Sequence, residues 1–175
     1  QKKERFIKDY SLNAYEANVL VSEKEISDYF EEVVKTSDIK LAKNWITGDL
    51  FASLNDKNIS ISESPIKAKE MASLINTISS GLISGRAAKE VFEVMKDSGG
   101  DPVEIIEKKG LKQKSDPKEL EILIDRILDE NKDKVAEYKS GKDKLFGFFV
   151  GQSMKASGGT ANPKLVNDIL KKKLK

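Results

Sequence analysis

The four prolines constrain the fold of this chain more than any other feature of its sequence, because each follows a residue type that commonly caps helices. They lie in the pairs Ser64–Pro65, Asp101–Pro102, Asp116–Pro117 and Asn162–Pro163. A proline in the first turn of a helix loses no hydrogen bond, since the N–H at that position has no acceptor within the helix. The pattern therefore predicts that all four prolines begin helices rather than break them.

Capping boxes strengthen this prediction. Glu104 follows Asp101 by three residues and Glu119 follows Asp116 by three, the spacing at which two side chains cap each other's backbone N–H groups. The segment from Ser22 to Glu25 has the same spacing without a proline. These segments all predict helix starts.

Between these starts, apolar residues recur every three or four positions, as in helices with one buried face. The stripes predict helices over residues 26–34, 41–54 (interrupted at Gly48), 71–78, 84–95, 102–109, 117–130, 132–139, 143–156 and 163–174. The strand-like piece Ile59–Ile61 is short enough to be a loop. The sequence thus predicts an all-α fold.

A boundary is expected near Ser79–Gly81, where longer helices give way to shorter ones with many caps. It divides the chain into two consecutive small bundles, a three-helix unit over residues 1–80 and a multi-helix tail over residues 81–175. A single continuous helical array is the alternative.

The composition excludes several kinds of active site. The chain has no His and no Cys, which excludes thiolate nucleophiles, Cys/His zinc sites and imidazole bases. Acidic pairs such as Glu31–Glu32 are interpreted as solvated helix faces, so no catalytic or metal-binding residue is predicted. The uncharged run from Met71 to Gly85 is too short to span a bilayer. The absence of Cys fits a cytoplasmic protein, and the start at Gln1 suggests a fragment.

Charge is distributed unevenly along the chain. Residues 1–80 carry 11 basic and 13 acidic side chains, residues 81–138 carry 11 and 14, and residues 139–175 carry 9 and 2. The basic surplus therefore lies in the last segment, as expected of a surface that faces a polyanion. A solvated lysine-rich terminus is the alternative.

The same segment contains a stripe of lysine and glycine. On a helix, Lys144, Gly151 and Lys155 lie within about 20° of one line, with Gly147 beside them. The two lysines would be about 16 Å apart along the axis, enough to contact phosphates two or three nucleotides apart. The glycines would let a nucleic-acid backbone approach closely. Alternatively, they admit a neighbouring helix, which geometry alone favours.

Further residues are candidates for the same interface. Lys142 and Lys164 would add charge, and backbone N–H groups at Gly158 and Gly159 would be available to cradle a phosphate. Alternatively, this turn is only a flexible connector between two helices, which the sequence alone favours. Phe148 either stacks on a base or belongs to the edge of the core. Lys112 and Lys114 form a smaller basic loop.

Several motifs occur in an order typical of one protein family. These are Leu111–Asp116, Tyr138–Lys142, Val150–Gln152 with Met154–Lys155, and Ala161–Pro163, preceded by Asn44–Ile46 upstream. In this order the chain resembles the C-terminal region of the B subunit of the glutamine-dependent aspartyl/glutamyl-tRNA amidotransferase (GatB), whose tail is shared with free-standing YqeY proteins. The upstream motif favours the GatB form.

The resemblance implies a role in converting misacylated Glu-tRNA(Gln) or Asp-tRNA(Asn) to the amidated form. In this family the A subunit releases ammonia from glutamine. A cradle region of the B subunit activates the acyl group with ATP and magnesium. This chain corresponds to the region that holds the outer corner of the tRNA around the D-loop, without a cofactor of its own. Its implied partners are tRNA and the A and C subunits, and neither DNA nor a membrane. It departs from the family at Ser157–Gly159, where relatives often carry another lysine.

Two other classes of function remain open. A protein-interaction module, or a free-standing YqeY-like protein, would dock onto a partner through its helices without a role in RNA binding. An autonomous enzyme would need paired carboxylates or a lysine base, and no concentrated acidic site lies on an apolar face.

Overall fold

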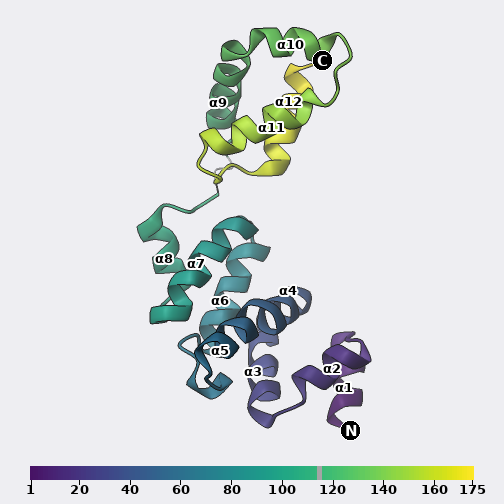
Figure 1. Cartoon of the computed structure of the whole chain (residues 1–175), viewed down its shortest axis with the longest axis vertical. Helices are drawn as coiled ribbons and strands as arrows, with labels where there is room; N and C mark the ends of the chain where they lie inside the picture. The colour runs from purple at the N-terminus through teal and green to yellow at the C-terminus, as the bar shows by residue number, and fades with distance from the viewer. Residues whose placement is uncertain (114–115) are drawn as a thin grey trace. The chain divides into compact units, whose positions relative to one another are not determined.

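The computed structural model describes residues 1–113 and 116–175, which form helices joined by turns (Figure 1). This confirms the all-α prediction. Contacts divide the described residues into a first unit, residues 1–80 and 88–109, and a second unit, residues 81–87 and 110–175.

The first unit is built around α6, which packs against α3, α4 and α8. Its helices are α1 (Lys2–Tyr10), α2 (Ala14–Leu20), α3 (Lys24–Val34), α4 (Ile39–Trp45), α5 (Phe51–Lys57), α6 (Ala68–Ser79), most of α7 (Gly85–Ser98) and α8 (Pro102–Lys109). Aromatic rings fill two parts of its core. Phe6, Tyr10 and Phe30 contact one another with centroids 5.1 to 5.6 Å apart, and Trp45 lies 5.6 Å from Phe92.

Helices α4 and α5 are joined without a break by a π-helical turn, η1 (Ile46–Leu50). The sequence predicted an interruption at Gly48, yet the helical path continues through it. Both Ile46 and Leu50 are buried. Gly48 therefore lies inside a widened turn rather than at a helix end.

The second unit is a small bundle in which α9, α11 and α12 pack against one another. Its helices are α9 (Pro117–Glu130), α10 (Lys132–Lys139), α11 (Leu145–Ala156) and α12 (Pro163–Lys173). The core contains Leu120, Ile124, Ile127, Phe149, Ala161, Val166, Ile169, Leu170 and Leu174. Helix α10 has no buried residue and lies against α9 and α11.

Some of the predicted helix starts are confirmed. The side chain of Asp116 accepts a hydrogen bond from the N–H of Lys118 (2.9 Å), and Asn162 accepts one from the N–H of Lys164 (3.0 Å). Pro117 and Pro163 each occupy the first turn of a helix.

One other predicted start and one predicted cap are wrong, although α3 begins at Lys24, close to its predicted start. Helix α6 begins at Ala68 rather than at Pro65, because the hydroxyl of Ser64 is buried and caps a bend by accepting from the N–H of Ile66 (3.1 Å). The Ser22 hydroxyl donates backwards to the carbonyl of Val19 instead of capping α3. A capping box that the sequence analysis missed forms between Asn13 and Glu16.

The unit boundaries differ from the sequence-based grouping. Residues 88–109 belong with the first unit, although the predicted boundary near residue 80 placed them with the tail. Which segments fold independently stays a prediction.

Candidate nucleic-acid interface

The second unit presents one open helix face with charges of a single sign. In α11, Phe149 and Ser153 are buried, which turns the opposite side of the helix to solvent. That side carries a lysine stripe, defined here as Lys144, Gly147, Gly151 and Lys155, all of which are exposed. Neither lysine of the stripe forms an ion pair with any described residue.

The glycines of the stripe face open space. Apart from the nearby backbone of α11 itself, a Cβ atom placed on Gly147 or Gly151 would meet no heavy atom of the described residues within 4 Å. The sequence-based preference for a helix packed against these glycines is therefore wrong. Along this face, a ligand can reach the helix backbone without displacing a side chain.

The other predicted lysines have different surroundings. Lys142 forms an ion pair with Glu137 (2.8 Å), and its ammonium holds the pKa of the Glu137 carboxyl below its ordinary value. Part of its charge is therefore neutralised within the unit. Lys164 is exposed in the first turn of α12 and has no ion-pair partner among the described residues.

The turn after α11 closes the helix instead of offering donors to a ligand. The N–H of Gly159 donates to the carbonyl of Met154 (2.8 Å), and the N–H of Gly158 donates to that of Lys155 (3.0 Å). Both glycines have positive φ, 64° and 78°. This is a Schellman cap, which uses both N–H groups. The expectation that these groups cradle a phosphate is wrong.

A cation that the sequence analysis did not name lies beside this turn. A Cβ on Gly159 would be 3.6 Å from a guanidinium nitrogen of Arg86, a residue that also belongs to the second unit. Arg86 is exposed. It is separated from the turn by some seventy positions in the sequence, so no local pattern indicates the contact.

Phe148 is half-buried, and it packs at the edge of the core. Its ring lies 5.5 Å from that of Phe149, and the ammonium of Lys134 lies 4.7 Å above its centroid. One ring face is thus taken by a cation. Of the two interpretations offered by the sequence, this arrangement favours the peripheral core.

The smaller basic loop is only partly described. Lys112 is exposed, and Lys114 lies outside the residues that the structure describes. The loop is anchored to the second unit by a hydrogen bond from the N–H of Gln113 to the carbonyl of Leu82 (2.7 Å).

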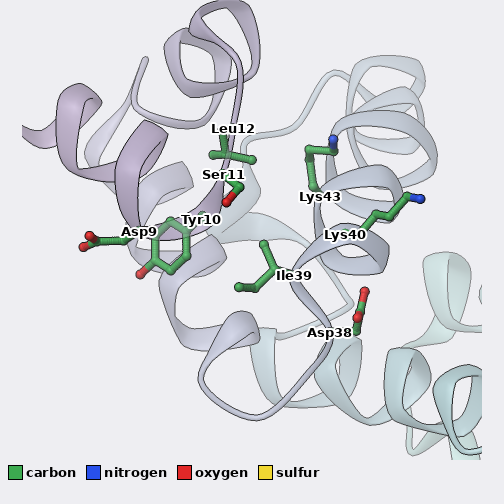
Figure 2. A pocket seen from close by; sticks show the side chains of 8 residues that line it. All are labelled: Asp9, Tyr10, Ser11, Leu12, Asp38, Ile39, Lys40 and Lys43. Atoms are coloured by element: carbon green, nitrogen blue, oxygen red, sulfur yellow. The ribbon is translucent and has the colours of Figure 1, made fainter.

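A cleft of about 430 Å³ in the first unit offers a contrast (Figure 2). Figure 2 shows Tyr10, Leu12 and Ile39 around its middle, with Asp9 at one side and Lys40 at the other. Lys43, also at its wall, is held by Glu16 (2.7 Å). Because charges of both signs surround the cleft, it is less suited to a polyanion than the lysine stripe.

Among the described residues, no group of three or more acidic side chains is arranged to hold a metal ion. None of the helices in this part of the chain has the length and apolar character needed to cross a membrane.

Comparison with known proteins decides the family. The family model GatB_Yqey, described as the GatB domain, matches residues 28–174. The chain belongs to this family. The match contains the whole lysine stripe and most of the first unit, so the resemblance recognised from motifs is confirmed.

The relatives are B subunits of aspartyl/glutamyl-tRNA(Asn/Gln) amidotransferases. The chain is 62% identical to the subunit of Pelagibacter ubique, and 50% identical to those of Ehrlichia ruminantium and Thioalkalivibrio sulfidiphilus. Each alignment covers 99% of this chain and 36 or 37% of the relative. The chain therefore spans little more than a third of these proteins, and it is homologous to their C-terminal part.

Proposed function

We propose that this chain is the tRNA-binding region of an amidotransferase B subunit. It would hold the outer corner of Glu-tRNA(Gln) or Asp-tRNA(Asn) while another region of the subunit carries out the ATP- and magnesium-dependent amidation. The A and C subunits are its proposed protein partners, and the cytoplasm is its proposed location. We assign no catalytic residue to this chain.

The observation that carries the proposal is the open lysine stripe on α11. Phosphates attract cations regardless of sequence, and contacts to phosphate position a protein on its nucleic acid. Lys144 and Lys155 present charge at two points of one line, and Gly147 and Gly151 leave the surface between them without side chains. This is a shape that an RNA backbone can follow.

The test is reversal of charge on the stripe. Lys144→Glu with Lys155→Glu should weaken binding of tRNA transcript to the 175-residue chain by tenfold or more, because two attractions become repulsions. Each lost phosphate contact should also lower the log–log slope of affinity against salt concentration by about 0.7 to 0.9. The measurement is a salt titration of the dissociation constant.

The matched control changes Lys24 and Lys69 to Glu. Both are exposed, both lie in first turns of helices, and neither has an ion-pair partner among the described residues. They belong to the first unit, so tRNA affinity should change little. If both double variants lose the same affinity, the stripe is only a solvated surface and the protein-interaction alternative is preferred.

A further inference from the structure

A second, largely apolar cleft of about 270 Å³ lies in the second unit, at the end of α11 where the lysine stripe finishes. It lies between the first turns of α9 and the last turn of α11, and its lining residues are Glu119, Leu120, Ile122, Leu123, Ala156 and Ser157. The side chain of Ile122 is 71% exposed, which is unusual for a large aliphatic residue on an amphipathic helix. Ala156 directly follows Lys155, so the cleft lies at the same end of α11 as the last lysine of the stripe, about 100° further around the helix.

Glu119 is the charged residue among the described residues that line this cleft, and its carboxylate has no partner among them. Its position predicts a capping box with Asp116, yet Asp116 caps α9 alone, through the N–H of Lys118. Glu119 forms no hydrogen bond or ion pair with any other described residue. The side chain is therefore available to whatever enters the cleft that it lines.

The other polar side chain of the cleft is already satisfied. The hydroxyl of Ser157 donates to the carbonyl of Met154 (2.8 Å) and accepts from the N–H of Ala161 (3.1 Å). The N–H of Ser157 donates to the carbonyl of Ser153 (3.2 Å). The side chains of the cleft thus offer an acidic acceptor and apolar surface, without a free donor. A complementary ligand needs apolar faces and N–H groups at one edge.

We propose that this cleft binds an unpaired guanine base of the RNA that follows the lysine stripe. The inference rests on the proposed function. An ionised carboxylate accepts hydrogen bonds through two oxygens, and guanine presents two adjacent donors, N1–H and the N2 amino group, on its Watson–Crick edge. On the same edge, adenine and cytosine each present one amino donor beside a ring nitrogen that is an acceptor. That acceptor would lie against a carboxylate oxygen, and two acceptors repel each other. Guanine is therefore the base that Glu119 fits best.

The apolar residues suit the faces of such a base. Proteins that recognise RNA loops commonly hold splayed bases against side chains and read their Watson–Crick edges. Ile122 and Leu123 supply the apolar contact here. The cleft is smaller than the pockets of about 300 to 1,000 Å³ that enclose drug-sized ligands, so it fits a base rather than a whole nucleotide.

Glu119→Gln distinguishes recognition of a base from a general effect of charge, because the two predict opposite changes in tRNA affinity. Removing a negative charge from a protein that binds a polyanion should strengthen binding. If Glu119 accepts from guanine, binding of tRNA(Gln) and tRNA(Asn) transcripts should instead weaken roughly tenfold, the scale of one bidentate base contact. The salt dependence should stay the same, because no phosphate contact is lost.

The matched control is Asp129→Asn, which removes one charge from another exposed, unpaired position of α9. It should leave affinity unchanged or slightly higher. Ile122→Ser should weaken binding without lowering thermal stability, since Ile122 is exposed.

Transcripts in which the guanosines of one loop at a time are replaced by inosine, which lacks the N2 amino group, complete a double-mutant cycle. Replacement in the contacted loop should weaken binding to the unmodified chain and have no further effect on Glu119→Gln.

The outcomes distinguish this inference from the proposed function. If the stripe variant loses affinity while Glu119→Gln behaves like Asp129→Asn, the guanine site is wrong and tRNA binding stands. The cleft would then be better suited to an apolar side chain of a protein partner. If the stripe variant binds tRNA as tightly as the unmodified chain, both proposals fail.

Discussion

The two units of this chain differ in how their charges are arranged. The first unit has 15 basic and 19 acidic residues, and the second has 16 and 10. In the first unit, ion pairs join distant parts of the sequence, for example Lys43 with Glu16 and Lys89 with Asp49. In the second unit, the lysines of the stripe form no ion pair with any acidic residue of the described part.

This difference concerns the electrostatic potential more than stability. Exposed ion pairs contribute only about 0 to 1 kcal/mol each, so pairing in the first unit chiefly cancels the field around those charges. Uncompensated lysines on one face produce a field that extends about 8 to 10 Å at physiological salt. The first unit therefore has a net charge of −4 with many of its charges paired, whereas the second has a net charge of +6 and an unpaired basic face that suits a polyanion.

The largest expected effect tests where the first unit ends. A chain of residues 1–109 should unfold cooperatively, whereas one of residues 1–80 should not fold. The shorter chain lacks the buried side chains of Val91, Phe92, Met95 and Ile106, each worth about 1.5 to 3 kcal/mol. Their sum is comparable to the whole stability of a domain, about 5 to 15 kcal/mol.

Urea titrations followed by circular dichroism would compare the two truncated chains. A cooperative transition for residues 1–80 alone would restore the sequence-based boundary at Ser79–Gly81.

The next effect tests whether the units unfold separately. Phe149→Ala should destabilise the second unit by about 3 to 5 kcal/mol, because Phe149 is fully buried in its core. Trp45 is the only tryptophan of the chain and belongs to the first unit, so its fluorescence reports that unit. Circular dichroism should show an early transition that tryptophan fluorescence does not. Coincident transitions would mean that the two units unfold as one.

A smaller effect concerns the glycines of the stripe. Gly151→Ala should stabilise the second unit by about 0.5 to 1 kcal/mol, since alanine favours the helix and its Cβ meets nothing within 4 Å. The same change should weaken tRNA binding if the RNA backbone touches the helix there. Thermal unfolding and a binding titration measure the two effects on one protein. A variant that is more stable and binds equally well would remove the glycines from the interface.

The smallest effect is the pH dependence of an ion pair in the first unit. A hydrogen bond from Lys43 lowers the pKa of Glu16 from its ordinary value of 4.5. A carboxyl whose pKa is lowered by folding stabilises the protein above its unfolded pKa, and this contribution is lost as the pH falls through the folded value. Glu16→Gln should therefore lower the melting temperature near pH 6 and make little difference at pH 3. An equal difference at both values would show that ionisation of Glu16 is irrelevant.

Local chemistry explains which parts of the fold could be predicted. The helices that start at Pro117 and Pro163 are each capped by the side chain of the preceding residue. That side chain accepts from an N–H two or three residues further on, so the sequence contains the information directly. Ser64 followed by Pro65 has the same local pattern, but there tertiary burial diverts the serine hydroxyl to a bend. Packing therefore explains the failure at Ser64, whereas at the exposed Ser22 a local hydrogen bond to the carbonyl of Val19 takes the place of the cap.

The candidate site was predicted in its residues but not in its surroundings. Helical periodicity placed Lys144 and Lys155 on one face, whereas the sequence cannot show whether another helix covers the glycines between them. The roles of Gly158 and Gly159 depended on where their N–H groups point, which only the geometry of the helix end reveals. Arg86 and the free carboxylate of Glu119 became visible only through contacts made, or not made, in three dimensions.

The π-helical turn between α4 and α5 lets this helix pair absorb the loss of one residue. A π turn contains one residue more than an α turn, so deleting Gly48 would leave a regular α-helix of nearly the same path. The extra residue is accommodated within the widened turn, so the residues on either side would keep nearly their present orientation. Trp45 and Leu54, both buried now, would still point into one core. The same deletion within a regular α-helix would instead rotate one part against the other by about 100°.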